Sequence, residues 1–157
     1  MRTKVWRTVL AGAIASLLVG VAFVGTTPAG ARPTSSQLHA RERMQLATNH
    51  SRVSHGVHRV SLNAVMSELA LKHSLAMAKA GYLFHTSDPA SYYLHGITWR
   101  IWGENVGVTG GAVAQMESAF MASPPHRANI LRPSFKHTAI GAVRWNGQLW
   151  ITVFFYG

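Results

Sequence analysis

The sequence predicts an α+β domain built as an α-β-α sandwich, in which helices cover both faces of a small antiparallel sheet. The dipeptide Asn146-Gly147 is a strong signal for a two-residue β-hairpin, and it separates two strand-like segments, 138–145 and 148–155. The second segment is almost continuously apolar, which is typical of a strand covered on both faces. Segments with apolar residues at helical spacing precede the hairpin and supply the covering layers.

The N-terminus has the features of a secretory signal peptide. Three basic residues among the first seven precede an apolar, small-residue-rich run over 9–24, and Ala29-Gly30-Ala31 forms an A-x-A cleavage signal. We expect cleavage after about Ala31, which leaves one secreted, extracellular domain over residues 32–157. The alternative is an uncleaved membrane anchor, although the apolar run is only just long enough to span a bilayer.

Two helices are predicted at the start of this domain. The first covers 37–53, with Ser35 or Ser36 as the expected N-cap and Gly56 beyond its end. The second lies between Asn63, the expected N-cap, and Gly81, which suits the C′ position. Its apolar residues recur at i, i+3, i+4 and i+7, so that the expected buried face consists of Val65, Met66, Leu69, Ala70, His73, Ala76, Met77 and Ala80.

The middle of the chain is predicted to be mostly loop. Segment 87–98 carries the turn pair Asp88-Pro89 and has room for one short helix. Segment 98–102 is β-branched and aromatic, which predicts a strand, and 107–111 is expected to be a flexible linker. A third helix is expected over 112–122, and the two prolines that follow this segment predict where the helix ends. Its expected buried residues are Val113, Met116 and Phe120.

Composition favours an exported protein with anionic partners. The chain has 15 Lys and Arg against 5 Asp and Glu, a formal net charge of +10, and such a field attracts anionic cell-envelope polymers or a membrane surface. No nucleic-acid-binding motif accompanies the charge, so nucleic acid is not an expected partner. The absence of cysteine excludes thiol and Cys-ligated metal chemistry and indicates a bacterial source. We expect a monomer.

Basic residues and histidines gather early in the mature segment. They have two interpretations, a solvated helix face with a basic loop, or an electrostatic tether that strengthens as the histidines protonate. The group comprises Arg32, His39, Arg41, Arg43, His50, Arg52, His55, His58 and Arg59. His55 and His58 have ligand-like spacing, but no acidic residue is near them in the sequence, so a metal site is not expected there.

Three separated motifs carry the candidate chemistry. They are Gly-Tyr-Leu-Phe-His-Thr-Ser at 81–87, Gly-Glu-Asn at 103–105, and Ser-Pro-Pro-His-Arg-Ala-Asn-Ile-Leu at 123–131. In this order they resemble the CAP superfamily of cysteine-rich secretory, antigen 5 and pathogenesis-related proteins, and its bacterial secreted, SCP-like branch fits best. The resemblance extends from about Met44 to Gly157 and implies the same α-β-α sandwich.

The resemblance implies a cleft formed by His85, Glu104, Ser123 and His126. Family members line this cleft with two histidines and two acidic residues, the second acid lying three residues after a tryptophan. Here Phe120 stands at the tryptophan position, so the second acid is replaced by Ser123. The cleft is therefore a reduced version with one acid.

Glu117 cannot substitute for the missing acid, because at 100° per residue it points to another side of the predicted helix; we expect a surface or helix-terminal contact for it. The candidate metal ligands are His85, His126 and Glu104, with zinc or calcium as candidate ions. A catalytic zinc site needs three protein ligands and an open position, so we expect weak metal binding at most.

The family resemblance implies an extracellular ligand-binding module, with lipids or sterols bound in some members and divalent metals in others. We expect a non-enzymatic module whose cleft takes a small molecule, a lipid or a weakly held cation. The alternatives are a purely structural envelope protein and a metal-assisted, peptidase-like hydrolase, with Glu104 as base. Serine hydrolysis through Ser123 and His126 is disfavoured, because the chain has no Gly-x-Ser-x-Gly elbow. Two interpretations remain for the aromatic residues: they line a lipid groove, or they pack in the core and at its rim. The residues are Tyr92, Tyr93, Trp99 and Trp102.

Overall fold

A four-stranded sheet forms the centre of the domain in the computed structural model, which describes residues 32–157. The strands are β1 (Ser61–Leu62), β2 (Trp102–Thr109), β3 (His137–Trp145) and β4 (Gln148–Tyr156), and their order is β1-β3-β4-β2. β4 pairs antiparallel with both β2 and β3, whereas β1 is parallel to β3. The signal peptide predicted over 1–31 lies outside the described residues.

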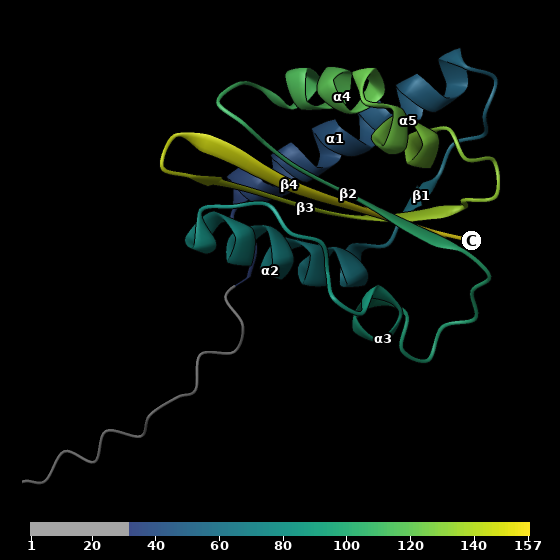
Figure 1. Cartoon of the computed structure of the whole chain (residues 1–157), viewed down its shortest axis with the longest axis horizontal. Coiled ribbons are helices and arrows are strands. Elements are labelled where there is room, and N and C mark those ends of the chain that lie inside the picture. Colours follow the sequence, from purple (N-terminus) through teal and green to yellow (C-terminus); the bar gives the residue numbers. More distant parts are fainter. Residues whose placement is uncertain (1–31) are drawn as a thin grey trace, which may run out of the picture. The chain divides into compact units, whose positions relative to one another are not determined.

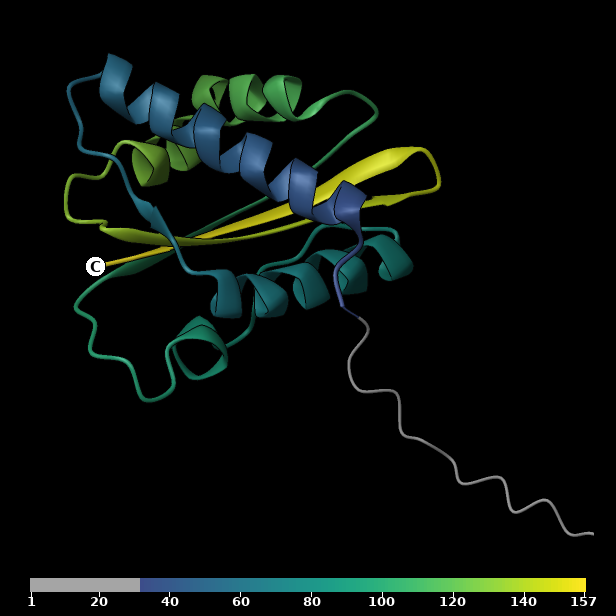
Figure 2. The same cartoon turned by 180° about the vertical axis from the view of Figure 1, so that it is seen from behind.

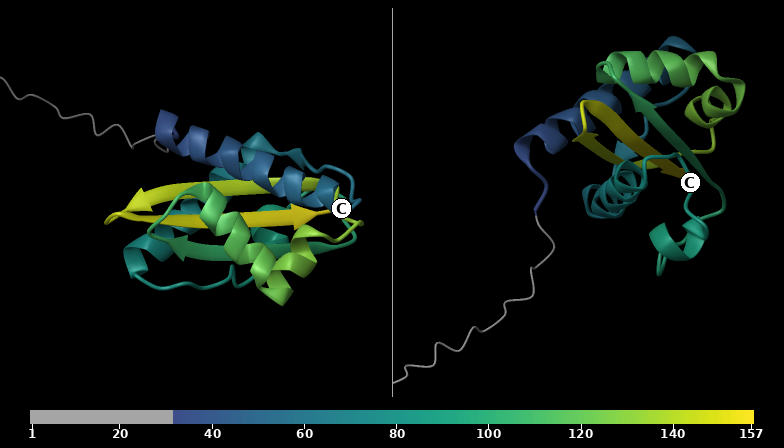
Figure 3. Two further views of the ribbon diagram at one scale, coloured as in Figure 1. Left: turned by 90° about the horizontal axis from the view of Figure 1, so that it is seen from above. Right: turned by 60° about the vertical axis from the view of Figure 1, so that its left-hand side comes forward.

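Helices cover both faces of this sheet (Figure 1). One layer contains α1 (Ser35–Ser54), α4 (Val113–Ala122) and α5 (Pro124–Ile130), and the other contains α2 (Ala64–Ala80) and α3 (Pro89–Tyr93). The reverse view shows α1 running along the first face, and the view from above shows α4 beside it (Figures 2 and 3). The predicted α-β-α sandwich is confirmed.

The apolar run of β4 is explained by this sandwich. Leu149, Ile151, Val153 and Phe155 belong to the core cluster that also contains residues of α1, α4 and α5. Trp150 and Phe154 alternate with them and pack in clusters with residues of α2. The predicted hairpin turn is also confirmed, because Asn146 (φ 48°) and Gly147 (φ 75°) both adopt the left-handed conformation that a type I′ turn requires.

The two N-terminal helices begin at side-chain caps. Thr34 caps α1 in place of the predicted serines, because Thr34 and Gln37 form a capping box, with each side chain bonded to the other's backbone N–H (3.3 and 2.7 Å). For α2 the prediction is confirmed, since Asn63 Oδ1 accepts a bond from Met66 N and Gly81 ends the helix with φ 78°.

The buried face of α2 is rotated from the predicted one. Val65 is 83 % exposed, whereas Ser67 and Ser74 are buried. Both serines are tolerated there because their hydroxyls bond to the sheet: Ser74 Oγ donates to Gly141 O (3.1 Å), and Ser67 Oγ accepts from Ile140 N (3.0 Å). Hydrophobic spacing alone did not anticipate these buried polar contacts.

The predictions for the central segment need three corrections. The strand lies at Trp102–Thr109 and not at 98–102, and it includes part of the expected linker at 107–111. Gly103 and Gly107 are strand residues whose missing side chains make room for helices, since a Cβ would lie 2.6 Å from Asn129 Oδ1 and from Met116 S, respectively. The prolines after α4 end that helix as expected, but they also begin α5, because proline is well suited to the first helical turn.

Arg52 does not belong to the basic surface predicted for α1. Its side chain is 0 % exposed. The guanidinium donates to the carbonyl oxygens of His58 (2.7 Å), Ile130 (2.6 Å), Arg132 (3.1 Å) and Phe135 (3.1 Å). This charge is therefore solvated by backbone dipoles and ties α1 to the α5–β3 connection.

Within residues 32–157, none of the helices combines the length and the apolar character that crossing a bilayer requires.

Candidate functional site

Glu104 is the fixed centre of the candidate site. It lies in β2, and its side chain is only 2 % exposed. The carboxylate accepts three hydrogen bonds: Oε1 from Thr86 N and from His85 Nδ1 (both 2.9 Å), and Oε2 from Thr86 Oγ1 (2.7 Å). These donors satisfy the buried acid and hold the loop that follows α2 against the sheet.

His85 is the accessible member of this pair. Its side chain is 60 % exposed, although its Nδ1 lies against the buried carboxylate. Because a carboxylate only accepts, Nδ1 carries the proton that is shared with it, and in the neutral form of the ring Nε2 has a free lone pair. The sequence placed a histidine in a cleft, and the structure places the buried carboxylate of Glu104 against its Nδ1, which fixes the orientation of the ring.

His126 is held at the start of α5 by its neighbours. Its Nδ1 lies 3.0 Å from Ser123 Oγ, and its ring packs against Phe120 with centroids 4.9 Å apart. Burial lowers the pKa of His126, and the nearby charge of His85 lowers it further. The two predicted histidines are therefore near enough for the charge of His85 to act on His126.

Two asparagines connect the strand that carries Glu104 to α5. Asn129 Nδ2 donates to Asn105 Oδ1 (2.9 Å), and Asn105 Nδ2 donates to the carbonyl of His126 (3.0 Å). Asn105 is a fully buried strand residue, and its side chain positions the helix that carries His126. The spacing of β2 and α5 is thus set by side-chain amides.

A hollow of about 340 Å³ opens beside the His85–Glu104 pair. It is lined by His85, Thr86, Pro89, Trp102, Gly103, Glu104 and Asn129. Ser123 and His126 do not line it, so they form a neighbouring pair rather than part of its wall. Thr86 was not among the predicted site residues; its place directly after the histidine, in a polar turn, was the available signal.

The described residues fit a tight metal centre poorly. Among residues 32–157, no three His, Asp or Glu side chains are placed to hold one ion together. The oxygens of Glu104 already accept three hydrogen bonds, whereas zinc needs about three protein ligands and calcium about six to eight oxygens. The candidate cation donors are the Nε2 atoms of His85 and His126.

The four aromatic residues considered for a lipid groove have different environments. Tyr93 is buried and stacks on Phe154 (4.1 Å), and burial together with the charge of Glu104 raises the pKa of its phenol. Trp102 lines the hollow beside Glu104, and Trp99 lines a separate one of about 700 Å³. Packing accounts for Tyr93, and the two tryptophans do not share one groove.

Glu117 and the histidines other than His85 and His126 that the sequence singled out lie in several different environments. Glu117 is not on the surface as expected, because its side chain is buried between α4 and α1. His73 is buried as predicted and contacts the Phe84 carbonyl through Nε2 (2.9 Å). His55 contacts Ser51 O through Nδ1 (2.8 Å), while His58 lies exposed in the loop after α1.

Solved bacterial structures share this fold. An extracellular protein containing a SCP domain from Bacillus anthracis matches with a TM-score of 0.66 and 20 % identity, over 80 % of this chain and 44 % of that one. A cysteine-rich secretory protein from Staphylococcus aureus matches with 0.65 and 20 % identity, over 80 % and 41 %. An outer surface protein from Borrelia burgdorferi matches with 0.67 and 10 % identity, over 75 % and 92 %.

Sequence comparison identifies the family. The uncharacterized protein YkwD of Bacillus subtilis is 28 % identical over 127 residues, and the matched region spans about half of its length (49 %) and 78 % of this chain. The cysteine-rich secretory protein family, CAP, matches residues 45–155, which include all three motifs and both histidines of the site. The chain therefore belongs to the cysteine-rich secretory protein (CAP) family.

Proposed function

We propose that the chain is an extracellular binding module whose cleft takes a small polar ligand or a weakly held divalent cation. The geometry of His85 carries this proposal, because its Nδ1 is fixed at 2.9 Å from a buried carboxylate while 60 % of the side chain is exposed. A ring held in one orientation with a free Nε2 is preorganised to accept a hydrogen bond or to coordinate a cation. His126 supplies a second ring nearby.

A binding role is favoured over hydrolysis by the state of Glu104. A general base must be able to reach a reacting proton, but this carboxylate is 2 % exposed and already accepts three bonds. Ser123 Oγ and His126 Nδ1 lie within hydrogen-bond distance (3.0 Å), which is the one observation that favours a hydrolase. The ring of that histidine also packs against the apolar ring of Phe120, and among residues 32–157 no acidic side chain is bonded to it to orient it as a catalytic base.

The extracellular location follows from the predicted signal peptide and fits a structural relative that is described as extracellular. We also propose that the surface is attracted to anionic cell-envelope polymers. Of the five acidic residues, Glu104 and Glu117 are buried and Glu68 is paired with Arg41 (3.2 Å), so little exposed negative charge offsets the basic residues. Such diffuse attraction weakens as salt rises.

Calorimetric titration of the mature domain with zinc chloride tests the cleft. We expect saturable heat with the parent chain and its loss in His85→Ala and in His126→Ala. The matched control is His58→Ala, which removes an exposed histidine from the loop after α1. Absence of heat with the parent chain, or equal heat in all three variants, would contradict cation binding in the cleft.

A substrate screen tests the hydrolase alternative. Peptide and ester substrates are incubated with the parent chain, with Glu104→Gln and with Ser123→Ala. We expect no turnover. Turnover that disappears in Ser123→Ala but persists in His58→Ala would replace the binding proposal with catalysis, whereas turnover unchanged in every variant would indicate a contaminant.

A further inference from the structure

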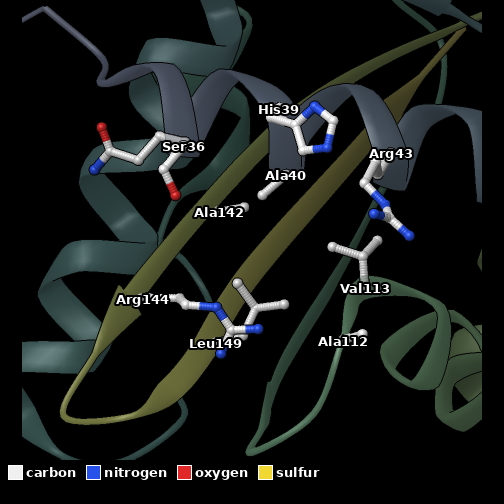
Figure 4. A pocket seen from close by; sticks show the side chains of 10 residues that line it. Ser36, His39, Ala40, Arg43, Ala112, Val113, Ala142, Arg144 and Leu149 are labelled. Atoms are coloured by element: carbon white, nitrogen blue, oxygen red, sulfur yellow. The ribbon is translucent and has the colours of Figure 1, made fainter.

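We propose that a second hollow, lined by none of the cleft residues, is a binding site for a phosphate group, as a monoester or a diester. It lies between the N-terminal half of α1, the start of α4 and the β3–β4 hairpin (Figure 4). Its volume is about 160 Å³. The lining residues are Ser36, Gln37, His39, Ala40, Arg43, Ala112, Val113, Ala142, Arg144 and Leu149.

The rim of this hollow is basic on two sides. His39 and Arg43 extend from α1, and Arg144 extends from β3 on the opposite side (Figure 4). None of the ten lining residues is acidic, so no neighbour within the wall neutralises these groups. The hollow therefore has positive charge on two sides, which favours an anionic ligand.

The rim side chains retain unused donors. Arg144 Nη2 donates to Gly111 O (3.0 Å), which anchors the guanidinium and leaves its other N–H groups for a ligand. Within residues 32–157, Arg43 has neither an ion pair nor a side-chain hydrogen bond, in contrast to Arg41, which contacts Glu68. The buried Arg52 shows the opposite case, since backbone carbonyls use its donors.

The shape of the site favours phosphate over carboxylate. Donors arrive from three side chains on two elements, which suits a tetrahedral oxyanion with several acceptor oxygens. Ser36 lies in the first turn of the 20-residue helix α1, whose N-terminal partial charge adds to the same field. The floor is formed by Val113, Ala142 and Leu149, all buried, and offers an apolar contact to the carbon atoms that carry the phosphate.

This site differs from the diffuse envelope attraction proposed above because it is saturable and depends on particular residues. Calorimetric titration with sn-glycerol 3-phosphate at fixed ionic strength is the test. We expect one site per chain, with affinity at least tenfold weaker in Arg43→Gln and in Arg144→Gln. The control Arg59→Gln removes an equal charge from an exposed position outside the hollow and is expected to bind as the parent does.

Two further variants separate the pocket from charge and from folding. Ala112→Leu keeps every charge and adds bulk at an exposed lining position, so it is expected to block binding. Arg144→Lys keeps the charge but loses the planar fork, and we expect intermediate affinity from a folded domain. Equal weakening in Arg43→Gln and Arg59→Gln, or no saturable heat with the parent chain, would overturn the proposal.

A second arm identifies the source of the phosphate. Co-sedimentation with phosphatidylglycerol vesicles is compared for the parent, Arg43→Gln and Arg59→Gln. If co-sedimentation is lost in Arg43→Gln alone, the phosphate that binds at the site belongs to a lipid headgroup. Equal sedimentation of all three, with glycerol phosphate binding intact, assigns it to a soluble or polymer-borne phosphate. Neither result depends on zinc binding in the cleft, so the two proposals fail separately.

Discussion

Thr48 and Glu117 join the two helices of one layer: Thr48 Oγ1 in α1 donates to Glu117 Oε2 in α4 at 3.1 Å, and both residues are buried. Among the described residues, Oε1 of the same carboxyl group has no hydrogen-bond partner. Burial therefore raises the pKa of Glu117 above its usual range, and its hydrogen-bonding neighbours offset this only in part. The contact is better suited to a neutral acid than to a carboxylate.

We expect Glu117→Gln to stabilise the domain at neutral pH. An acid whose pKa is raised by folding contributes stability below its unfolded pKa, and that contribution is lost as pH rises through its folded pKa. The amide in Glu117→Gln does not ionise, so the variant does not lose this stability as pH rises. The measurement is the difference in Tm between variant and parent from about pH 4 to 8, which should increase with pH. The matched control is Glu42→Gln, which makes the same substitution at an exposed position of α1.

Replacement of Arg52 by methionine is expected to destabilise the domain by about 3–5 kcal/mol, because carbonyl oxygens that now accept from it would be left buried without donors. Urea denaturation monitored by tryptophan fluorescence provides the free energy of unfolding. Arg59→Met, at an exposed position, should change it by no more than about 0.5 kcal/mol. Similar losses in both variants would show that the buried network is not the cause.

Gly141→Ala tests the closest approach between α2 and the sheet. An added Cβ would lie 2.1 Å from the backbone carbon of Ala70, and a helix backbone cannot move away without disturbing the layer. We expect a loss of at least about 1–3 kcal/mol in thermal or urea unfolding. Gly110→Ala is the control, since a Cβ at Gly110 meets nothing within 4 Å. An unchanged Tm for Gly141→Ala would mean that the two elements separate easily.

The titration of His126 tests the pairing of the two histidines. Burial and the charge of His85 both lower the pKa of His126, so its NMR titration midpoint should fall below 6.5. In His85→Ala the second cause is removed, and the midpoint should rise while staying below that of an exposed histidine. Because folding lowers this pKa, the stability that the neutral ring contributes is present above the unfolded pKa and is lost as pH falls through the lower, folded pKa. If the titration midpoint of His126 is the same in His85→Ala as in the parent chain, the charge of His85 does not act on His126.

Features encoded by neighbouring residues were predictable from the sequence. The hairpin at Asn146-Gly147 and the ends of α2 at Asn63 and Gly81 depend on backbone conformations that a few local residues select. The layered architecture followed from the apolar run of β4, because only a covered strand tolerates it. His85, Glu104 and His126 were found through motifs.

Features that depend on tertiary contacts were not predictable. Gly107 was assigned to a flexible linker, but it is a strand residue that makes room for Met116. Arg52 resembled a surface charge, since arginine is rarely buried, and its four carbonyl partners come from segments far away in the sequence or in the adjoining loop. The helical position of Glu117 correctly excluded it from the cleft, but its burial depended on α1, whose packing angle no local pattern specifies.

Many small exported domains hold distant segments together with disulfides, and this chain has no cysteine with which to do so. Arg52 makes the corresponding cross-link, joining α1 to three carbonyls that lie 78, 80 and 83 residues further along the chain. Such a link assembles without an oxidant or an isomerase and is unaffected by reductants. The domain can therefore keep its fold whether its surroundings are oxidising or reducing.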